Sequence, residues 1–357
     1  LAWSAGLDGV FGVHGLAPSA DGRILLGGAH VLSPWVAKVD LDGNLLWSKV
    51  YAPSVYNVRG FARTPGGKAV LVGSTNVEGS NFDEFALAVD DEGNALWGAS
   101  YDGGAEATEV RPSPDGVVVA GLTASQSGAD NAGHVMRLSE DGAVVWNRRL
   151  GGSVSFLYTL DATPEGFVTA GLGPVGLPVV RLSPAGEVVS SHVLYDRTQT
   201  LLEFSARAVR ALPGGGFALA GARNFGAAAD GLLAAVGGDD VVRFASSFGG
   251  PQEDTFGLLL PVDRGLVALG GSKSLGDRAL AVGLRTTASG LGELAGFARA
   301  ALTLSYDPDG TTIEPGVELP TLESDAPAVQ RTPIAFAVDP AGDAATQGQA
   351  TLSWTKR

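Results

Sequence analysis

The chain has no cysteine in its 357 residues, so it can form no disulfide, thiolate metal site or thiol-linked lipid anchor. Basic residues are also scarce, since 24 Lys and Arg stand against 38 Asp and Glu, for a formal charge of −14. Binding to nucleic acid or to an anionic membrane requires a basic face, so we expect neither partner. No apolar run approaches the roughly 18 residues of a transmembrane segment.

Helical patterns and catalytic signatures are missing as well. No stretch keeps the i, i+3, i+4, i+7 apolar stripe over the 10 to 12 residues or so that a helix needs. The 52 glycines and 19 prolines interrupt the chain too often for long helices. No Gly-x-Ser-x-Gly or His-Glu-x-x-His sequence occurs. Short segments rich in Val, Leu, Ala and Phe, bounded by Gly, Asp, Pro and Ser, predict β-strands instead.

A repeat dominates what is present. Val39–Trp47, Val89–Trp97 and Leu138–Trp146 each combine an acidic or polar turn, a glycine and a tryptophan. The turn glycine recurs at intervals of 44 to 52 residues, at positions Gly43, Gly93, Gly142, Gly186, Gly238, Gly290 and Gly342. A second marker, an apolar run that closes on glycine, keeps the same phase in Asp21–Gly27, Gly66–Gly73, Asp115–Gly121, Glu165–Gly171, Gly214–Gly221, Arg264–Gly270 and, more weakly, Asp309–Gly316. Two markers in phase indicate a repeat architecture.

Each copy predicts four antiparallel strands, which is one blade of a β-propeller. In the second copy we expect strands at Val58–Arg63, Lys68–Ser74, Phe85–Asp90 and Asn94–Tyr101. The fold class is therefore all-β, with seven four-stranded blades in residues 1–342. Residues 1–9 match the outer-strand pattern around Trp47, and we expect them to close the seventh blade, whose other strands would lie in 299–340.

The last repeat leaves an alternative open. Its 321–332 loop is acidic and contains proline, and residues 343–357 are left over once Trp3 fills the outer position. These residues could form a C-terminal tail or an extra edge strand. Six blades with a C-terminal β appendage is the rival architecture.

The repeat resembles a known class of proteins. Asp42–Tyr51, the following Tyr101–Gly104 turn and the strand Gly116–Gly121 resemble the blades of secreted bacterial β-propeller repeat proteins. The Gly-x-x-x-Trp element is similar to the tryptophan-docking repeats of propellers related to quinoprotein dehydrogenases. The resemblance covers about residues 1–300 and implies a propeller fold and an extracytoplasmic location, whether periplasm, cell surface or medium. A removed signal peptide would explain why the chain starts at Leu1.

Few residues stand out as functional candidates. Trp47, Trp97 and Trp146 occupy equivalent positions, which favours packing between neighbouring blades over ligand binding. Four aspartates recur before the third strand of their copies: Asp83, Asp130, Asp230 and Asp277. Carboxylates at matching positions could converge on calcium, although aspartate also serves as an ordinary turn residue. No other cofactor and no catalytic residue is indicated.

The sequence therefore favours a noncatalytic extracytoplasmic interaction or scaffold module. Its expected partners are other envelope or surface proteins, as for a peripheral subunit of an envelope complex or an adhesin. Two alternatives stay open: a propeller enzyme acting on carbohydrate or with a quinone, and a lectin-like module that binds sugar or calcium. Fold alone cannot choose among them.

Overall fold

The computed structural model describes most of residues 12–287 and short stretches on either side. The described ranges are 5–7, 12–76, 82–102, 104–123, 131–152, 154–163, 165–174, 176–196, 204–212, 214–223, 229–249, 251–262, 265–274, 280–287, 298–301, 304–307, 324–325, 331–333, 337–338 and 354–356. The chain divides into two compact units. Unit 1 comprises Leu1–Gly128, His134–Arg149 and Ala326–Arg357, and unit 2 comprises Ala129–Gly133 and Leu150–Asp325.

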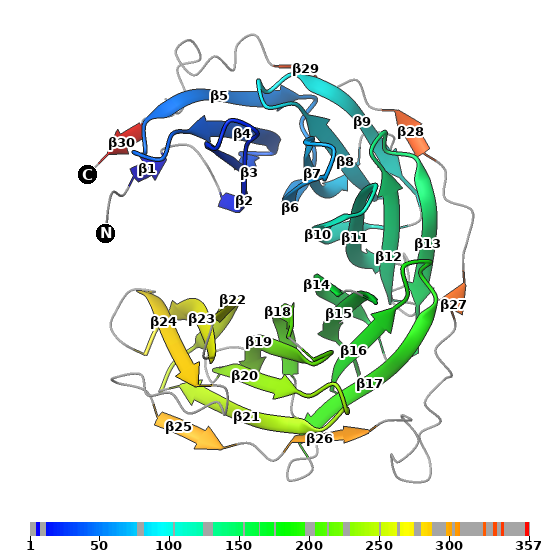
Figure 1. The fold of residues 1–357 in the computed structure, drawn as a ribbon, viewed down its shortest axis with the longest axis vertical. Coiled ribbons are helices and arrows are strands. Elements are labelled where there is room, and N and C mark those ends of the chain that lie inside the picture. The colour runs from blue at the N-terminus through cyan, green and yellow to red at the C-terminus, as the bar shows by residue number, and fades with distance from the viewer. Residues whose placement is uncertain are drawn as a thin grey trace. The chain divides into compact units, whose positions relative to one another are not determined.

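Unit 1 contains three antiparallel blade sheets, each made of four strands consecutive in the chain (Figure 1). The first is β2 (Gly12–Pro18), β3 (Ile24–His30), β4 (Ser33–Val39) and β5 (Leu45–Ala52). The second is β6 (Asn57–Arg63), β7 (Ala69–Thr75), β8 (Asp83–Val89) and β9 (Ala95–Tyr101). The third is β10 (Glu106–Ser113), β11 (Gly116–Thr123), β12 (Ala132–Ser139) and β13 (Val144–Leu150).

Unit 2 continues the pattern with two sheets built on four consecutive strands and, in the described residues, one sheet of three strands. The fourth sheet is β14 (Phe156–Thr163), β15 (Gly166–Leu172), β16 (Leu177–Leu182) and β17 (Val188–Asp196). The fifth is β18 (Phe204–Ala211), β19 (Phe217–Arg223), β20 (Asp230–Val236) and β21 (Val242–Gly249). The sixth is β22 (Asp254–Val262), β23 (Gly265–Ser272) and β24 (Leu280–Thr287).

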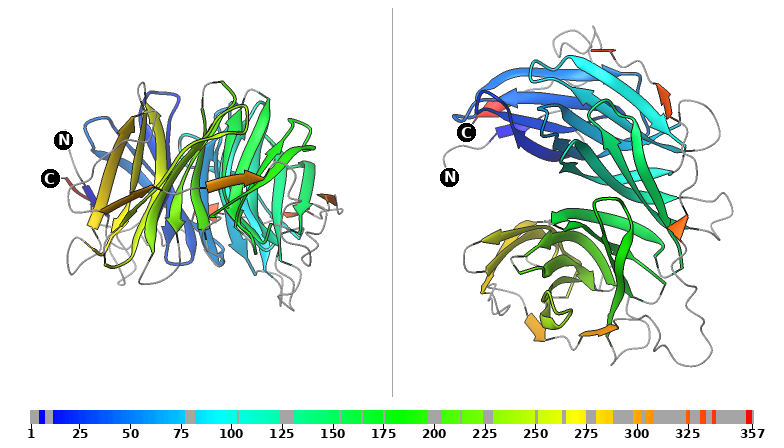
Figure 2. Two further views of the ribbon diagram at one scale, coloured as in Figure 1. Left: turned by 90° about the horizontal axis from the view of Figure 1, so that it is seen from below. Right: turned by 45° about the vertical axis from the view of Figure 1, so that its right-hand side comes forward.

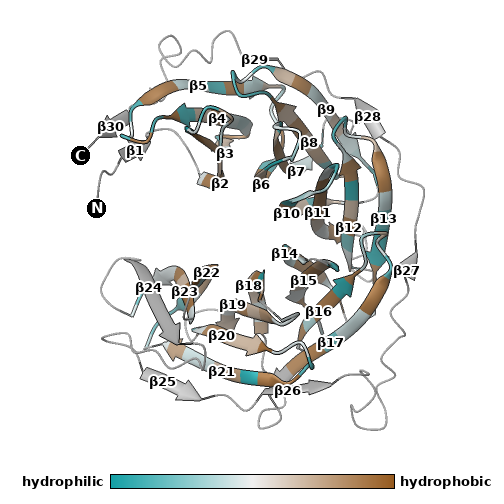
Figure 3. Cartoon of the chain, in the orientation of Figure 1, coloured by the Kyte–Doolittle hydropathy of each residue, from teal (hydrophilic) through white to brown (hydrophobic). Residues whose placement is uncertain are grey.

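The strands lie where the sequence pattern predicts them. In the second blade every predicted strand is present, with ends shifted by no more than two residues. Figure 2 shows the strands of each sheet side by side and twisted, and in Figure 3 the interior strands β8 and β11 are mostly brown. The prediction of a propeller-like, all-β repeat fold is confirmed at this level. No helix long and apolar enough to cross a membrane occurs among the described residues.

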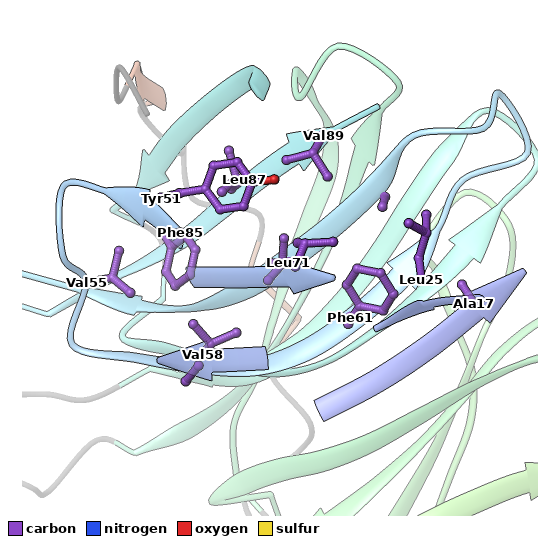
Figure 4. Close-up of a cluster of buried hydrophobic side chains, with 13 residues drawn as sticks. Ala17, Leu25, Tyr51, Val55, Val58, Phe61, Leu71, Phe85, Leu87 and Val89 are labelled. Carbon is purple, nitrogen blue, oxygen red and sulfur yellow. The ribbon is translucent and has the colours of Figure 1, made fainter. Parts of the chain in front are cut away.

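The cores of unit 1 lie between successive blade sheets. Leu25 of the first sheet and Phe61, Leu71 and Phe85 of the second form one buried cluster (Figure 4). A Cβ atom at Gly27 would overlap the ring of Phe61, so this glycine makes room for the aromatic side chain of the next blade. A second cluster, which includes Val72, lies between the second and third sheets. Each blade therefore buries both faces only by stacking on a neighbour.

The repeated tryptophans join neighbouring blades, as predicted. A Cβ at Gly93 would lie 2.9 Å from the ring of Trp47, and the Tyr51 hydroxyl donates to the Gly93 carbonyl at 3.0 Å. The same arrangement follows one blade later, where the Trp97 indole N–H donates to the Glu140 carbonyl at 2.8 Å. The turn glycines accept these rings because they lack side chains and adopt positive φ angles, 77° at Gly93.

The C-terminal region differs from the expected seventh blade. Six blade sheets are found in the described residues, not seven. The described parts of 299–340 instead add short antiparallel strands to outer strands of earlier sheets: β25 (Ala298–Ala301) to β21, β26 (Leu304–Asp307) to β17, β28 (Arg331–Pro333) to β9 and β29 (Ala337–Val338) to β5. The strand β27 (Ser324–Asp325) also lies in this region.

Short strands from the two chain ends pair with each other in the described residues. The strand β1 (Ala5–Leu7) forms a two-stranded sheet with β30 (Trp354–Lys356). Of residues 1–9 only Ala5–Leu7 are described, so the expectation that this segment supplies the outer strand of a seventh blade stays a prediction. Residues 299–340 carry only the weak closing-glycine marker Asp309–Gly316 and no tryptophan, and their described strands are added to open outer edges of earlier sheets.

Candidate functional site

The first strand of every blade sheet carries a β-bulge at the same place. At each bulge the strand register skips one residue, which we call the bulge residue. The bulge residues are His14, Arg59 and Thr108 in unit 1 and Tyr158, Arg207 and Gly257 in unit 2. Bulges redirect a side chain out of the regular alternation and are common beside functional sites. The framework of these sheets is shared, whereas the chemistry at the bulge changes from blade to blade.

A glycine on the second strand accompanies each bulge. A Cβ at this glycine would collide with a backbone carbonyl of the first strand, so no other residue fits. The glycine and carbonyl pairs are Gly28 and Gly12, Gly73 and Asn57, Gly121 and Glu106, Gly171 and Phe156, Gly221 and Ser205, and Gly270 and Thr255. The apolar runs that close on glycine therefore have a structural cause, and in the first blade the required residue is Gly28, next to the predicted Gly27.

The bulge residues of unit 1 form a polar group. The Arg59 Nε donates to Glu106 Oε1 at 2.7 Å, and the Asn57 amide donates to the same oxygen at 3.3 Å. Partial burial, and to a smaller extent the positive charge of Arg59, lower the pKa of His14 below its usual value. The charge of Arg59 is thus already balanced by a carboxylate within the protein.

The pKa of His14 provides a direct test of this arrangement. We expect NMR titration of the His14 ring to give a midpoint below 6.5, because both burial and a nearby cation disfavour the protonated form. Substitution Arg59→Gln should move the midpoint upward, toward the ordinary histidine value. A midpoint that does not respond to this substitution would contradict the proximity of the two side chains.

The bulge residues of unit 2 are of a different chemical kind. Tyr158 lies beside Phe156, with ring centroids 6.1 Å apart and an angle of 13° between the ring planes. The guanidinium of Arg207 lies over the Tyr158 ring, 4.7 Å from its centroid. Both aromatic side chains are partly exposed and Arg207 is exposed. We call these three residues the aromatic–arginine cluster.

A cavity opens in unit 1 at the opposite end of the first strands. It has a volume of about 870 Å³ and lies where β2, β6 and β10 end and their turns begin. Its apolar lining includes Leu16, Pro18, Phe61, Pro65 and Pro112. Leu16 is 69% exposed, which is unusual for so large an apolar side chain. We call this site the turn cavity.

The charged groups of the turn cavity are paired with one another. Arg63 Nη2 lies 3.0 Å from Asp91 Oδ2, and its Nη1 donates to the Pro18 carbonyl at 2.6 Å. Arg111 Nη1 lies 2.8 Å from Glu109 Oε1. The contact of Arg63 with the Pro18 carbonyl joins the first and second blades, whereas the two ion pairs lie within one blade each.

A buried carboxylate–imidazole pair lies between the second and third blades. Glu84 Oε2 is 3.0 Å from His134 Nδ1, and both side chains are 1% exposed. Glu84 Oε1 and His134 Nε2 have no hydrogen-bond partner among the described residues. A Cβ at Gly121 would lie 2.7 Å from Glu84 Oε1, so the third blade is packed directly against the carboxylate. The pair is enclosed by protein and cannot be reached by a substrate without local opening.

The aspartates selected from sequence are only partly described. Asp83 begins β8 and Asp230 begins β20, whereas Asp130 and Asp277 lie outside the described residues. Burial raises the pKa of Asp230, Arg223 opposes this shift, and the nearby Asp254 adds to it. Within the described part of the chain no three His, Cys, Asp or Glu side chains group so as to hold a metal ion. Calcium binding by these four aspartates stays a prediction.

No protein-family model and no curated protein sequence matches the chain. Among solved structures, Sqt1 from Chaetomium thermophilum is 13% identical, with a TM-score of 0.44, over 81% of this chain and 84% of that chain. A further Sqt1 structure, bound to the N-terminus of the ribosomal protein L10, has a TM-score of 0.41 at 12% identity, over 78% of this chain and 84% of that chain. A Bacteroides uniformis protein described as a candidate 6-phosphogluconolactonase is 12% identical, with a TM-score of 0.40, over 79% of this chain and 98% of that chain. Likeness at this level carries no inference about function.

Proposed function

We propose that this protein is a noncatalytic interaction module whose turn cavity binds a polypeptide segment of a partner protein. The observation that carries the proposal is the cavity itself, an apolar depression of about 870 Å³ with an exposed leucine at its edge. A depression of this size accommodates one or two large apolar side chains. Such anchors contribute most of the free energy of binding at protein interfaces.

The charges in the turn cavity support binding over catalysis. A general acid or base must be free to exchange a proton with a substrate. Arg63 uses its guanidinium for Asp91 and two backbone carbonyls, those of Pro18 and Gly67. The guanidinium of Arg111 donates to both carboxylate oxygens of Glu109. The cationic groups therefore shape the site and do not supply reactive chemistry.

The proline residues of the turn cavity favour an extended partner. Pro18, Pro65 and Pro112 end or follow the first strands of three successive blades, and none has a backbone N–H group. Their rings give a stiff apolar surface that loses little conformational entropy on binding. A partner would place apolar side chains between the walls and leave its own main chain exposed to water.

The proposal includes the location and partners expected from the repeat. The resemblance to secreted propeller repeats supports an extracytoplasmic location, with partners among envelope or surface proteins. Fractionation of the source cells, followed by immunodetection of this protein, tests the location. Recovery with the cytoplasmic fraction would reject it and leave the peptide-binding proposal to be judged separately.

Substitution Leu16→Glu should abolish peptide binding, because it places a charge at the apolar edge of the turn cavity. The measurement is selection of a random peptide library on the folded protein, followed by titration of the enriched peptides against the variants. We expect at least a tenfold loss of affinity for Leu16→Glu. Leu41→Glu is the matched control, since Leu41 is 68% exposed, against 69% for Leu16, and lies in the β4–β5 turn.

Two results would reject the turn cavity as the binding site. One is a selection that enriches no peptide. The other is an enriched peptide that binds the Leu16 and Leu41 variants equally well.

A further inference from the structure

The aromatic–arginine cluster contains an arginine without an ionic partner among the described residues. The Tyr158 ring is the contact that positions the Arg207 guanidinium, and no carboxylate of the described chain lies within ion-pair distance of it. Arg59, at the equivalent bulge in unit 1, is instead paired with Glu106 at 2.7 Å. In a chain of formal charge −14, an exposed arginine held ready on an aromatic ring is suited to binding an anion.

The aromatic rings restrict the kind of anion. Phe156 and Tyr158 are separated by one residue on β14 and their planes are nearly parallel, 13° apart. Partly exposed rings in this arrangement offer flat apolar surface, with a partial negative charge on each ring face. The C–H groups on one face of a pyranose ring are weakly positive and pack well on such a surface. A small inorganic anion would leave this surface unused.

The adjacent blade carries no side chain at its own bulge. The corresponding bulge residue of the sixth sheet is Gly257, and a Cβ built there would meet no atom within 4 Å. Leu258, the next residue of β22, is 55% exposed. The sixth sheet therefore has no side chain at the bulge position and an exposed apolar side chain at the next residue.

We propose that the aromatic–arginine cluster binds an acidic sugar, a pyranose ring that carries a carboxylate. The guanidinium of Arg207 donates two N–H groups to the carboxylate in the bidentate geometry that arginine favours. The pyranose ring packs on the partly exposed Phe156 ring, because the guanidinium of Arg207 already lies over the Tyr158 ring, and its hydroxyl groups face water. A polyanion such as nucleic acid would need several cations, whereas this cluster supplies one. The site lies in unit 2 and does not depend on the proposed role of the turn cavity in unit 1.

The test is calorimetric titration of the whole protein with three small probes. Methyl glucuronide carries both ring and carboxylate, methyl glucoside carries the ring alone, and N-acetylglutamate amide carries a carboxylate without a sugar ring. We expect the glucuronide to bind at least tenfold more tightly than either of the others. Substitution Arg207→Gln should reduce glucuronide affinity at least tenfold, and Phe156→Leu should also weaken it.

Arg59→Gln is the matched control, because Arg59 occupies the same bulge position on another blade and should not affect sugar binding. Circular dichroism and thermal melting confirm that each variant is folded. Equal affinity for glucuronide and glucoside would overturn the role of Arg207, and equal affinity for glucuronide and the glutamate derivative would overturn the assignment to a sugar. Absence of binding to all three probes at 20-fold molar excess over a roughly millimolar protein concentration would overturn the site.

Discussion

Substitution Gly221→Ala should destabilise the protein by about 3 kcal/mol, although it adds a single methyl group. The Cβ of alanine would collide with the backbone carbonyl of Ser205, and backbone atoms cannot move aside as the end of a flexible side chain can. The bulge that presents Arg207 would have to rearrange or the two strands separate. Urea denaturation gives the change in free energy, and amide hydrogen exchange should accelerate first along β18 and β19.

Gly151→Ala is the control for this prediction. A Cβ at Gly151 would meet no atom within 4 Å, and its backbone does not require a positive φ angle. We therefore expect a change below about 0.5 kcal/mol. If the two substitutions cost the same, the collision with the Ser205 carbonyl would not be the cause, because the reduced flexibility of the unfolded chain favours the folded state at both positions.

The repeat markers show how much of the fold was predictable. The closing glycine is required where the second strand meets a carbonyl of the first strand, and the turn glycine is required where the turn has a positive φ angle. Because both requirements return in each blade, one sequence is enough to predict the blades. The fifth blade shows where the pattern misleads, since Asp240 and not Gly238 occupies the left-handed turn position, with a φ of 60°. Gly238 lies in the same turn, but its left-handed position is taken by Asp, which accepts this conformation more readily than most residues.

The candidate sites were less predictable for a physical reason. Arg59 and Arg207 occupy equivalent positions, yet only the structure shows that one is paired with Glu106 and the other lies on Tyr158. Such differences depend on contacts between blades about 50 residues apart, which a repeat pattern does not specify. A useful signal was nevertheless present, because in each described blade the glycine that closes the second strand pairs with the residue directly before the bulge residue. Asking which residue types occur there would have found Tyr158 and Arg207.

In the C-terminal region the repeat pattern predicted more regular structure than the described residues show. Counting glycines at regular intervals extended the repeat through Gly290 and Gly342, both outside the described residues. The described strands of this region pair instead with β5, β9, β17 and β21. A strand added to an outer edge is held mainly by main-chain hydrogen bonds, which most residue types can form. Strand addition therefore leaves no clear periodic pattern in the sequence.

A buried pair gives the second large prediction. Replacing either member of the Glu84–His134 pair by leucine should cost about 3 kcal/mol, because the remaining polar group loses its partner in a site that excludes water. Replacing both should cost no more than one single substitution, since no unpaired group is then left. Urea denaturation of the four proteins gives the coupling energy between the two positions, which we expect to be about 3 kcal/mol.

Arg59 and Glu106 provide the comparison pair in the same unit. Their separation is 2.7 Å, but the Arg59 side chain is 52% exposed. Water and salt screen such a pair, so its coupling energy should stay below about 1 kcal/mol. Strictly additive costs at Glu84 and His134 would contradict the pairing and would require each side chain to act through separate contacts. Strong coupling at the buried pair together with weak coupling at the exposed one would show that the second and third blades are joined by a specific polar contact as well as by apolar packing.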